Sequence, residues 1–297
     1  MWGIRLVFKM ATLLGRWPTR QFLALIAFWY AVFDRPAQRA SRLWHERIHE
    51  RPATFWDAYK HIRRFVNITL DRVFLLSGKH SYFEVNRNGN EHLQALSDAK
   101  KGAILLGAHM GSFEAMRIGG DQEDFLINIV GHFENAKMIN TMLTELNPEM
   151  ASRVIHVGQD PIGSALTLQE RLAEGEMVAI LGDRTGISDK TVTVNFMGRP
   201  AEFPAGPFLL ASILKSPVYL VFGLYFEPNR YELFCEPFAE RIKLPRGNRQ
   251  AGLEATVQNY ADRLEHYCRL APDNWFNFYD FWKSAEFSEP PSKTNVE

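Results

Sequence analysis

The sequence predicts an α/β fold: a layered αβα sandwich with a mostly parallel central sheet, preceded by amphipathic helices at the N-terminus. Three observations lead to this fold class. Short apolar runs of strand length recur along the chain, helical patterns separate several of them, and turn residues bound some of them. Because strands that alternate with helices form right-handed βαβ units, the sheet should be largely parallel and covered on both faces.

The expected elements follow in chain order. Residues 53–76 have the broad apolar face of a long helix. Strands are expected at 103–107, 125–130, 153–157, 177–181 and 218–226, and helices at 136–146, 162–174, 208–215 and 253–270. After the turn at 228–229, residues 231–235 should return as an antiparallel edge strand.

The chain length and these elements suggest the domain organisation. The 297 residues have room for one large α/β domain or two small ones. We expect a helical, membrane-associating segment at 1–50, one α/β domain at 51–287 and a frayed polar tail at 288–297.

Composition excludes several classes of protein. Apolar residues make up 46% of the chain and charged residues 23%, which argues against disorder and against a polytopic membrane protein. The 34 basic and 34 acidic residues balance, so a general nucleic-acid binder is not expected. The two cysteines, Cys235 and Cys268, form no C-x-x-C, which favours a reducing compartment. The 22 Phe, 9 Tyr and 7 Trp either fill a core or line a lipid site, and composition does not separate these.

The N-terminal segment combines positive charge with apolar residues. Its first 42 residues carry seven basic residues and a single acid. Four residues recur at helical spacing and predict one polar, mainly basic face: Arg5, Lys9, Thr12 and Arg16. The apolar run 21–33 spans roughly 20 Å at 1.5 Å per residue, short of the ~30 Å hydrocarbon core of a membrane. An interfacial helix pair is the favoured interpretation, on the cytoplasmic face of the inner membrane; a core hairpin and a cleaved signal peptide stay open.

The segment 107–114 contains the candidate catalytic residues. His109 follows a predicted buried strand, so it should lie at the carboxyl edge of the sheet, where open α/β folds bind ligands. Gly111 permits a tight turn, and Ser112 can cap the helix that follows. Glu114 can then fold back to the imidazole, fix its tautomer and stabilise the imidazolium. Such a pair can activate a hydroxyl or amine for attack on a thioester, although strand-end histidines are more often structural.

The motif His109-x4-Glu114 after an apolar strand resembles the H-x4-D/E motif of the glycerolipid acyltransferase superfamily, and in particular the bacterial lipid A late acyltransferases. The resemblance also covers the basic N-terminus, the stretch 181–186 and the aromatic end 274–283. It implies that His109 is the general base and Glu114 its partner. It implies further that acyl carrier protein or coenzyme A donates the acyl thioester to a membrane lipid acceptor, without a covalent acyl-enzyme or a cofactor.

Two positions depart from that family. Phe113 stands where the family has tryptophan, and Gly131-His132-Phe133 stands where lipid A enzymes have Tyr-Arg-Pro. Because a planar guanidinium suits phosphate, the missing arginine favours another amphipathic acceptor, such as a glycolipid, a lysolipid or a pigment that carries an acyl chain.

Further polar residues are expected at the same edge of the sheet. Asp183 and Arg184 follow the strand expected at 177–181. Arg184 would bind a donor phosphate or, with backbone amides near Gly111, the oxyanion, while Asp183 positions it; a salt-bridged loop is the alternative. His132 is a candidate second contact to substrate.

A competing motif occurs at 45–49, where His45-Glu46-Arg47-Ile48-His49 matches the HExxH pattern of zinc proteases. The arginine inside the motif, the charged surroundings and the missing third ligand argue against a metal site. A non-catalytic lipid-binding or assembly protein on the same fold is the second alternative. We expect a membrane-peripheral acyltransferase.

Overall fold

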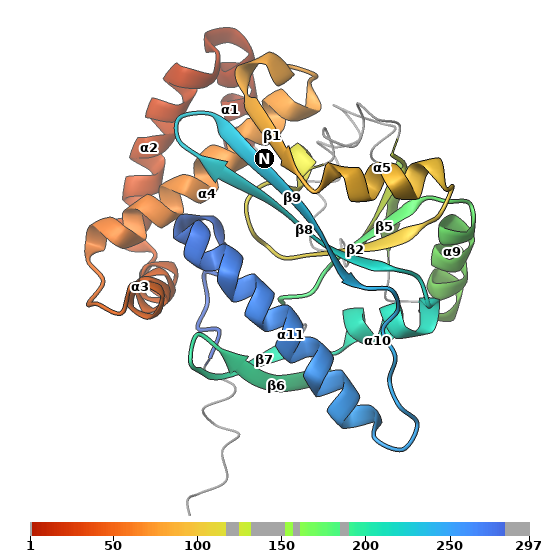
Figure 1. The fold of residues 1–297 in the computed structure, drawn as a ribbon. Helices are drawn as coiled ribbons and strands as arrows, with labels where there is room; N and C mark the ends of the chain where they lie inside the picture. The colour runs from red at the N-terminus through yellow and green to blue at the C-terminus, as the bar shows by residue number, and fades with distance from the viewer. Residues whose placement is uncertain (1, 117–124, 132–151, 157–160, 185–189, 283–297) are drawn as a thin grey trace, which may run out of the picture.

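The structure is a computed structural model that describes residues 2–116, 125–131, 152–156, 161–184 and 190–282. Its central sheet has seven strands in the order β1-β9-β8-β2-β5-β3-β4. The strands β8, β2, β5, β3 and β4 run parallel to one another, whereas β9 is antiparallel to β8. Figure 1 shows this sheet with helices on both sides. The predicted fold class is therefore confirmed.

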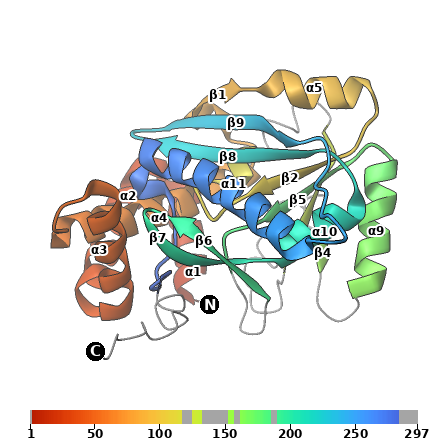
Figure 2. The same ribbon diagram turned by 60° about the horizontal axis from the view of Figure 1, so that its bottom comes forward.

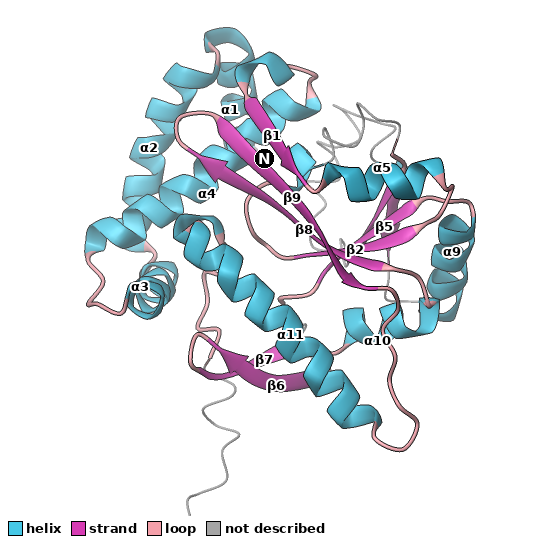
Figure 3. Ribbon diagram, in the orientation of Figure 1, coloured by secondary structure: helices cyan, strands magenta, loops and turns pink. Residues whose placement is uncertain are grey.

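The strands of this sheet are β1 (Glu84–Asn88), β2 (Ala103–Gly107), β3 (Ile127–Gly131), β4 (Val154–His156), β5 (Met177–Leu181), β8 (Val218–Phe226) and β9 (Arg230–Ala239). The strands β6 (Thr191–Phe196) and β7 (Arg199–Pro204) form a separate antiparallel hairpin. The helices are α1 (Trp2–Leu14), α2 (Arg16–Phe33), α3 (Arg35–His49), α4 (Phe55–Leu76), α5 (Asn90–Asp98), α9 (Pro161–Ala173), α10 (Gly206–Leu214) and α11 (Arg249–Leu270), with short 3-10 turns at His80–Tyr82 and Pro272–Asn274. Figure 3 shows how helices and strands are distributed.

The two faces of the sheet carry different helices. On β2, the side chains of Ile104 and Leu106 belong to the same core as Tyr260 of α11. Leu105 points to the opposite face and packs in a second core with Leu96 of α5. Figure 2 shows α11 and α5 on opposite sides of the sheet. Because both faces are covered, every residue of β2 is buried, and the strand is a continuous apolar run in the sequence.

The prediction for the sheet edge needs a correction. The expected antiparallel return after residues 228–229 is β9, but β9 is not an edge, because β1 pairs parallel to its outer side. β1 has the sequence Glu-Val-Asn-Arg-Asn and is mostly exposed. With one apolar residue it lacks the alternation that identifies a half-buried strand. The helix expected at 136–146 lies outside the described residues.

The N-terminal helices pack together at one end of the sheet, where α2 and α3 both contact α4 (Figure 1). Ala27 and Ala31 of α2 are fully buried against Ile62 of α4. A capping box begins α4: Thr54 and Asp57 satisfy each other's backbone N–H groups. None of the helices in the described residues combines the length and apolar character needed to cross a membrane.

Candidate active site

His109 lies in the turn that follows β2, at the carboxyl edge of the sheet. The turn is held from two sides, since Gly111 N–H donates to the carbonyl of Asn274 and Ser112 N–H donates to that of Gly223, each at 2.8 Å. Gly111 has φ +65°, and a Cβ there would lie 1.9 Å from the Gly223 carbonyl oxygen, so only glycine fits. The tight turn expected from Gly111 is therefore present, but its amide and that of Ser112 are already engaged and are not free for an oxyanion.

The imidazole of His109 is paired with Asp183. Its Nδ1 lies 2.7 Å from Oδ1 of Asp183, which follows the neighbouring strand β5. The His109 backbone N–H also donates to both carboxylate oxygens, at 3.0 and 3.1 Å. The imidazole is 31% exposed, whereas the carboxylate is completely buried. One carboxylate therefore fixes both the main chain and the ring of His109.

Asp183 is kept ionised by its surroundings. Besides His109, its Oδ2 accepts a hydrogen bond from the indole Nε1 of Trp275 at 3.0 Å and a longer one, 3.5 Å, from Nδ2 of Asn277. Burial alone raises the pKa of Asp183, but the charge and hydrogen bonds of His109, helped by Arg184, outweigh it and hold the pKa below its usual value. A negative charge is therefore available to stabilise an imidazolium at His109.

Glu114 takes a different position from the one expected. Its Oε2 lies 3.1 Å from Nε of Arg72 on α4 and accepts a hydrogen bond from the hydroxyl of Ser112 at 3.3 Å. Ser112 also caps the short helix by accepting from the backbone N–H of Ala115 at 3.1 Å. Within the described residues, the orienting contact that the sequence led us to expect from Glu114 is made by Asp183.

Arg184 lies at the rim of the same site and is exposed. Its Nε donates to Oδ1 of Asn277 at 2.8 Å, and its Nη2 donates to the carbonyl of Phe276. The structure thus brings Arg184 close to His109 through the segment 274–277 rather than through a hydrogen bond that Arg184 donates to Asp183. His132, the other expected contact, lies outside the described residues.

The segment 274–277 belongs to the aromatic end that the resemblance covers, but sequence reasoning assigned it no role in the site. Trp275 forms a β-bridge with Met110, and Phe276 N–H donates to the carbonyl of His109 at 2.9 Å. Asn274 is buried and its side chain pairs with both backbone groups of Tyr225. The sequence signal was present, because two asparagines interrupt an aromatic run, and buried amides there need partners.

An apolar cavity of about 50 Å³ adjoins the turn. Phe113 and Met116 line it, together with Leu105, Val221 and Cys235 from the sheet. Burial raises the pKa of the Cys235 thiol to about 12, so this cysteine is a neutral lining group. The cavity places an apolar surface beside the residues that follow His109.

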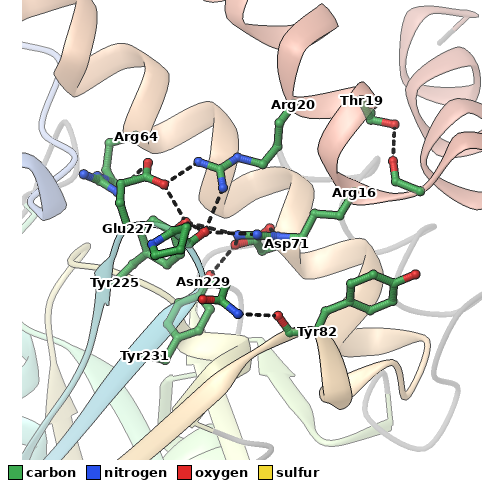
Figure 4. Close-up of polar contacts among 12 residues, drawn as sticks. Arg16, Thr19, Arg20, Arg64, Asp71, Tyr82, Tyr225, Glu227, Asn229 and Tyr231 are labelled. Carbon is green, nitrogen blue, oxygen red and sulfur yellow. Dashed lines mark hydrogen bonds and ion pairs between the residues drawn. The ribbon is translucent and has the colours of Figure 1, made fainter.

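The N-terminal basic face is partly internal, which corrects the sequence interpretation. Arg16 forms a bidentate pair with the fully buried Asp71 of α4, at 2.7 and 2.9 Å. Arg20 pairs with Glu227 at 2.6 Å and donates to the Pro228 carbonyl. Figure 4 shows both guanidinium groups directed at the end of the β8–β9 hairpin. These cations fasten α2 to the α/β domain and do not face solvent.

An apolar face of α2 is exposed instead. Its large residues have exposed fractions between 41% and 72%: Trp17, Leu25, Phe28, Trp29, Val32 and Phe33. Arg35, Arg39 and Arg42, on the first turns of α3, are exposed and share one helix face by their spacing. Several large apolar side chains exposed on one helix face indicate an interaction face.

The first histidine of the HExxH segment faces the protein interior, whereas His49 is exposed. His45 is buried, its Nε2 lies 3.4 Å from Oδ1 of Asp273, and its ring stacks on that of His49. The neighbouring Trp44 is also buried and donates to the carbonyl of Pro272. In the part of the chain that is described, no three His, Cys, Asp or Glu side chains are grouped to hold a metal ion.

The chain matches a known protein family over most of its length. Residues 62–284, about three quarters of the chain, match the family described as bacterial lipid A biosynthesis acyltransferase. The matched region begins within α4 and includes His109, Glu114, Asp183 and the segment 274–277. A search of curated proteins finds no match to the chain.

Proposed function

The chain belongs to the bacterial lipid A biosynthesis acyltransferase family, and from this premise we propose that it moves a fatty acyl group from an acyl thioester to a hydroxyl or amine of a lipid or glycolipid acceptor. The donor is acyl carrier protein or coenzyme A carrying the acyl chain, and the protein needs no cofactor. The apolar cavity beside Phe113 and Met116 supports an apolar substrate.

The observation that carries this proposal is the 2.7 Å contact between Nδ1 of His109 and Oδ1 of Asp183. A carboxylate only accepts hydrogen bonds, so Nδ1 carries the proton and Nε2 is the basic nitrogen. Nε2 takes the proton of the acceptor hydroxyl as its oxygen attacks the thioester carbonyl. The C–S bond then breaks, the leaving thiolate takes the proton from the imidazolium, and the products are an acyl ester and a free thiol.

In this mechanism Asp183 replaces Glu114 as the orienting carboxylate. Its buried charge stabilises the imidazolium that forms during transfer. Arg184, held by Asn277 and the Phe276 carbonyl at the rim, is the cation placed to meet the oxyanion or a donor phosphate. Glu114 keeps a role in the site through Arg72.

The proposed location is the surface of the inner membrane, on its cytoplasmic face. The exposed apolar face of α2 would enter the boundary between headgroups and acyl chains, and Arg35, Arg39 and Arg42 of α3 would meet anionic headgroups. Such docking would let the enzyme reach a lipid acceptor that stays in the membrane.

Three single variants test the proposal in a radiolabelled acyl-transfer assay with membrane extracts. H109A should lose at least about 100-fold in rate, because general-base catalysis supplies a factor of 10² to 10⁴, and D183N should show a comparable loss. H49A is the matched control, since His49 is exposed at the end of α3. Transfer that survives H109A would point to the alternative, a lipid-binding protein without this chemistry.

A further inference from the structure

The ion pair between Glu114 and Arg72 involves only one nitrogen of the Arg72 guanidinium, Nε. The Glu114 side chain is 11% exposed and needs a nearby cation, which Arg72 provides through its Nε at 3.1 Å. The Arg72 side chain, however, keeps 29% of its surface exposed. One ion pair accounts for the buried carboxylate, but it does not account for a half-buried arginine that faces solvent at the same time.

A guanidinium carries five N–H donors in a rigid plane. The ion pair with Glu114 is made through Nε, whose own N–H has no hydrogen-bond partner within the described residues. Within the described residues the two terminal nitrogens of Arg72, with four N–H groups, have no hydrogen-bond partner. Paired terminal N–H groups match two oxygens of a phosphate or carboxylate. The arginine therefore retains the donors that bind an oxyanion of a ligand.

The helix that carries Arg72 is fixed at the preceding residue. Asp71 accepts from Nε of Arg16 at 2.7 Å and from the hydroxyl of Tyr231 at 3.0 Å, so α2 and β9 both hold it (Figure 4). The contacts of Asp71 thus fix the orientation of α4 next to Arg72. Glu114 holds the Arg72 side chain at Nε. A side chain fixed at its backbone and at Nε loses less conformational entropy when its terminal nitrogens bind a ligand.

We propose that Arg72 is an anion-binding residue of the active site, positioned by Glu114, and that its ligand is a phosphate group of a substrate. This inference rests on the proposed acyltransferase function. The phosphate has two possible sources: the phosphopantetheine arm that acyl carrier protein and coenzyme A share, or a phosphorylated lipid acceptor. Glu114 is then a positioning residue that acts through Arg72.

The test is equilibrium binding to the full-length protein, with two pairs of probes that each differ by one phosphate. Lauroyl-phosphopantetheine against lauroyl-pantetheine represents the donor, and lysophosphatidic acid against monoacylglycerol represents the acceptor. The wild type should prefer the phosphorylated member of one pair. R72Q should reduce that preference by roughly 10-fold or more, which is the usual effect of losing a charged hydrogen bond. R72K, which keeps the charge without the planar fork, should fall between the two.

Two further variants keep the test decisive. K60Q makes the same change of charge at an exposed lysine on the same helix, and it should leave the preference unchanged. R72Q alone leaves the Glu114 carboxylate buried without its cation, and this variant could unfold. R72Q/E114Q removes both charges and so provides a folded alternative. The proposal is overturned if the wild type prefers neither phosphorylated probe, or if folded R72K and R72Q/E114Q retain the full preference. Binding needs no acyl transfer, so a wild type that binds but does not transfer would count against the proposed function alone.

Discussion

At the residue scale, His61 is a histidine that the fold keeps neutral. It is completely buried, with Nδ1 2.9 Å from the hydroxyl of Ser41 and Nε2 2.8 Å from the carbonyl of Trp275. A carbonyl only accepts, so Nε2 carries the proton and Nδ1 accepts from Ser41. Burial, with a smaller contribution from His45, lowers the pKa of His61 to about 3. His61 thus holds the segment that supports Asp183.

This pKa predicts acid sensitivity. Below pH ~6.5 the unfolded chain takes up a proton at His61, but the folded chain does not until pH falls to about 3. The unfolded state therefore binds more protons, and stability falls by about 1.4 kcal/mol per pH unit, or about 2 kcal/mol at pH 5. Urea unfolding of wild type and H61Q at pH 7, 6 and 5 checks this. H61Q should show the shallower dependence; equal slopes would contradict the assignment.

At the element scale, the two faces of α2 differ in what they contact. Its buried face carries Arg16, paired with Asp71, and Arg20, paired with Glu227. Its opposite face presents large apolar residues to solvent. Helical spacing shows which basic residues share one face of a helix, but it does not show what that face packs against. The basic stripe in the sequence therefore could not separate cations that pair inside the protein from cations that would contact a membrane.

The ion pair on the buried face predicts a stability effect. R16M should destabilise the protein by about 3–5 kcal/mol, because it leaves the carboxylate of Asp71 buried without its cation. R35M, at an exposed arginine of α3, should change stability by no more than about 0.5 kcal/mol. Urea unfolding of both variants measures the difference. A small effect in R16M would mean that Arg16 is a surface cation, as its sequence pattern first indicated.

The exposed face of α2 predicts membrane binding. W29S/F33S should weaken binding to vesicles of phosphatidylethanolamine with 30% phosphatidylglycerol by roughly 100-fold or more, because each aromatic side chain gains about 1.5–3 kcal/mol on leaving water. The melting temperature should hardly change, since both residues are exposed. I162S, at an exposed isoleucine of α9, is the control for a loss of apolar surface elsewhere. Vesicle flotation that is unchanged in W29S/F33S would rule out this face as the docking surface.

At the scale of the whole molecule, Trp275 is where separate parts of the chain meet. Its ring packs against Trp44 of α3 with centroids 4.6 Å apart, its carbonyl accepts from His61 of α4, and its indole N–H donates to Asp183 after β5. Its backbone also bridges to Met110, the residue after His109. The N-terminal helices, the sheet and the C-terminal segment therefore converge on the pair of His109 and Asp183.

This convergence predicts that Trp275 affects both stability and catalysis. W275F keeps an aromatic ring but removes the N–H that Asp183 accepts, which should cost about 1–3 kcal/mol for a less satisfied buried charge. The rate of transfer should fall in the folded variant, because the carboxylate that orients His109 is held less firmly. Thermal unfolding and steady-state transfer rates measure the two effects. F276Y is a comparison, since Phe276 is buried nearby but makes only a backbone contact to His109.

Much of the fold could be predicted because its signals are local. Buried parallel strands such as β2 and β5 are short apolar runs, and the residues that follow them must lie at the same edge of the sheet. On that basis the sequence predicts His109, Asp183 and Arg184 at one edge of the sheet, and in the structure His109 contacts Asp183 there. The polar strand β1 gave no such signal, because it buries almost no side chain.

The sequence by itself determined the α/β class, the strand ends that carry His109 and Asp183, and the turn that only Gly111 can make. Tertiary structure alone decided which carboxylate meets the imidazole. Asp183 is 74 residues from His109 and reaches it because β2 and β5 are neighbours, whereas the nearby Glu114 turns to Arg72 of α4. Local periodicity encodes where a residue lies on its own element, but the order of strands and the packing of α4 select its partner.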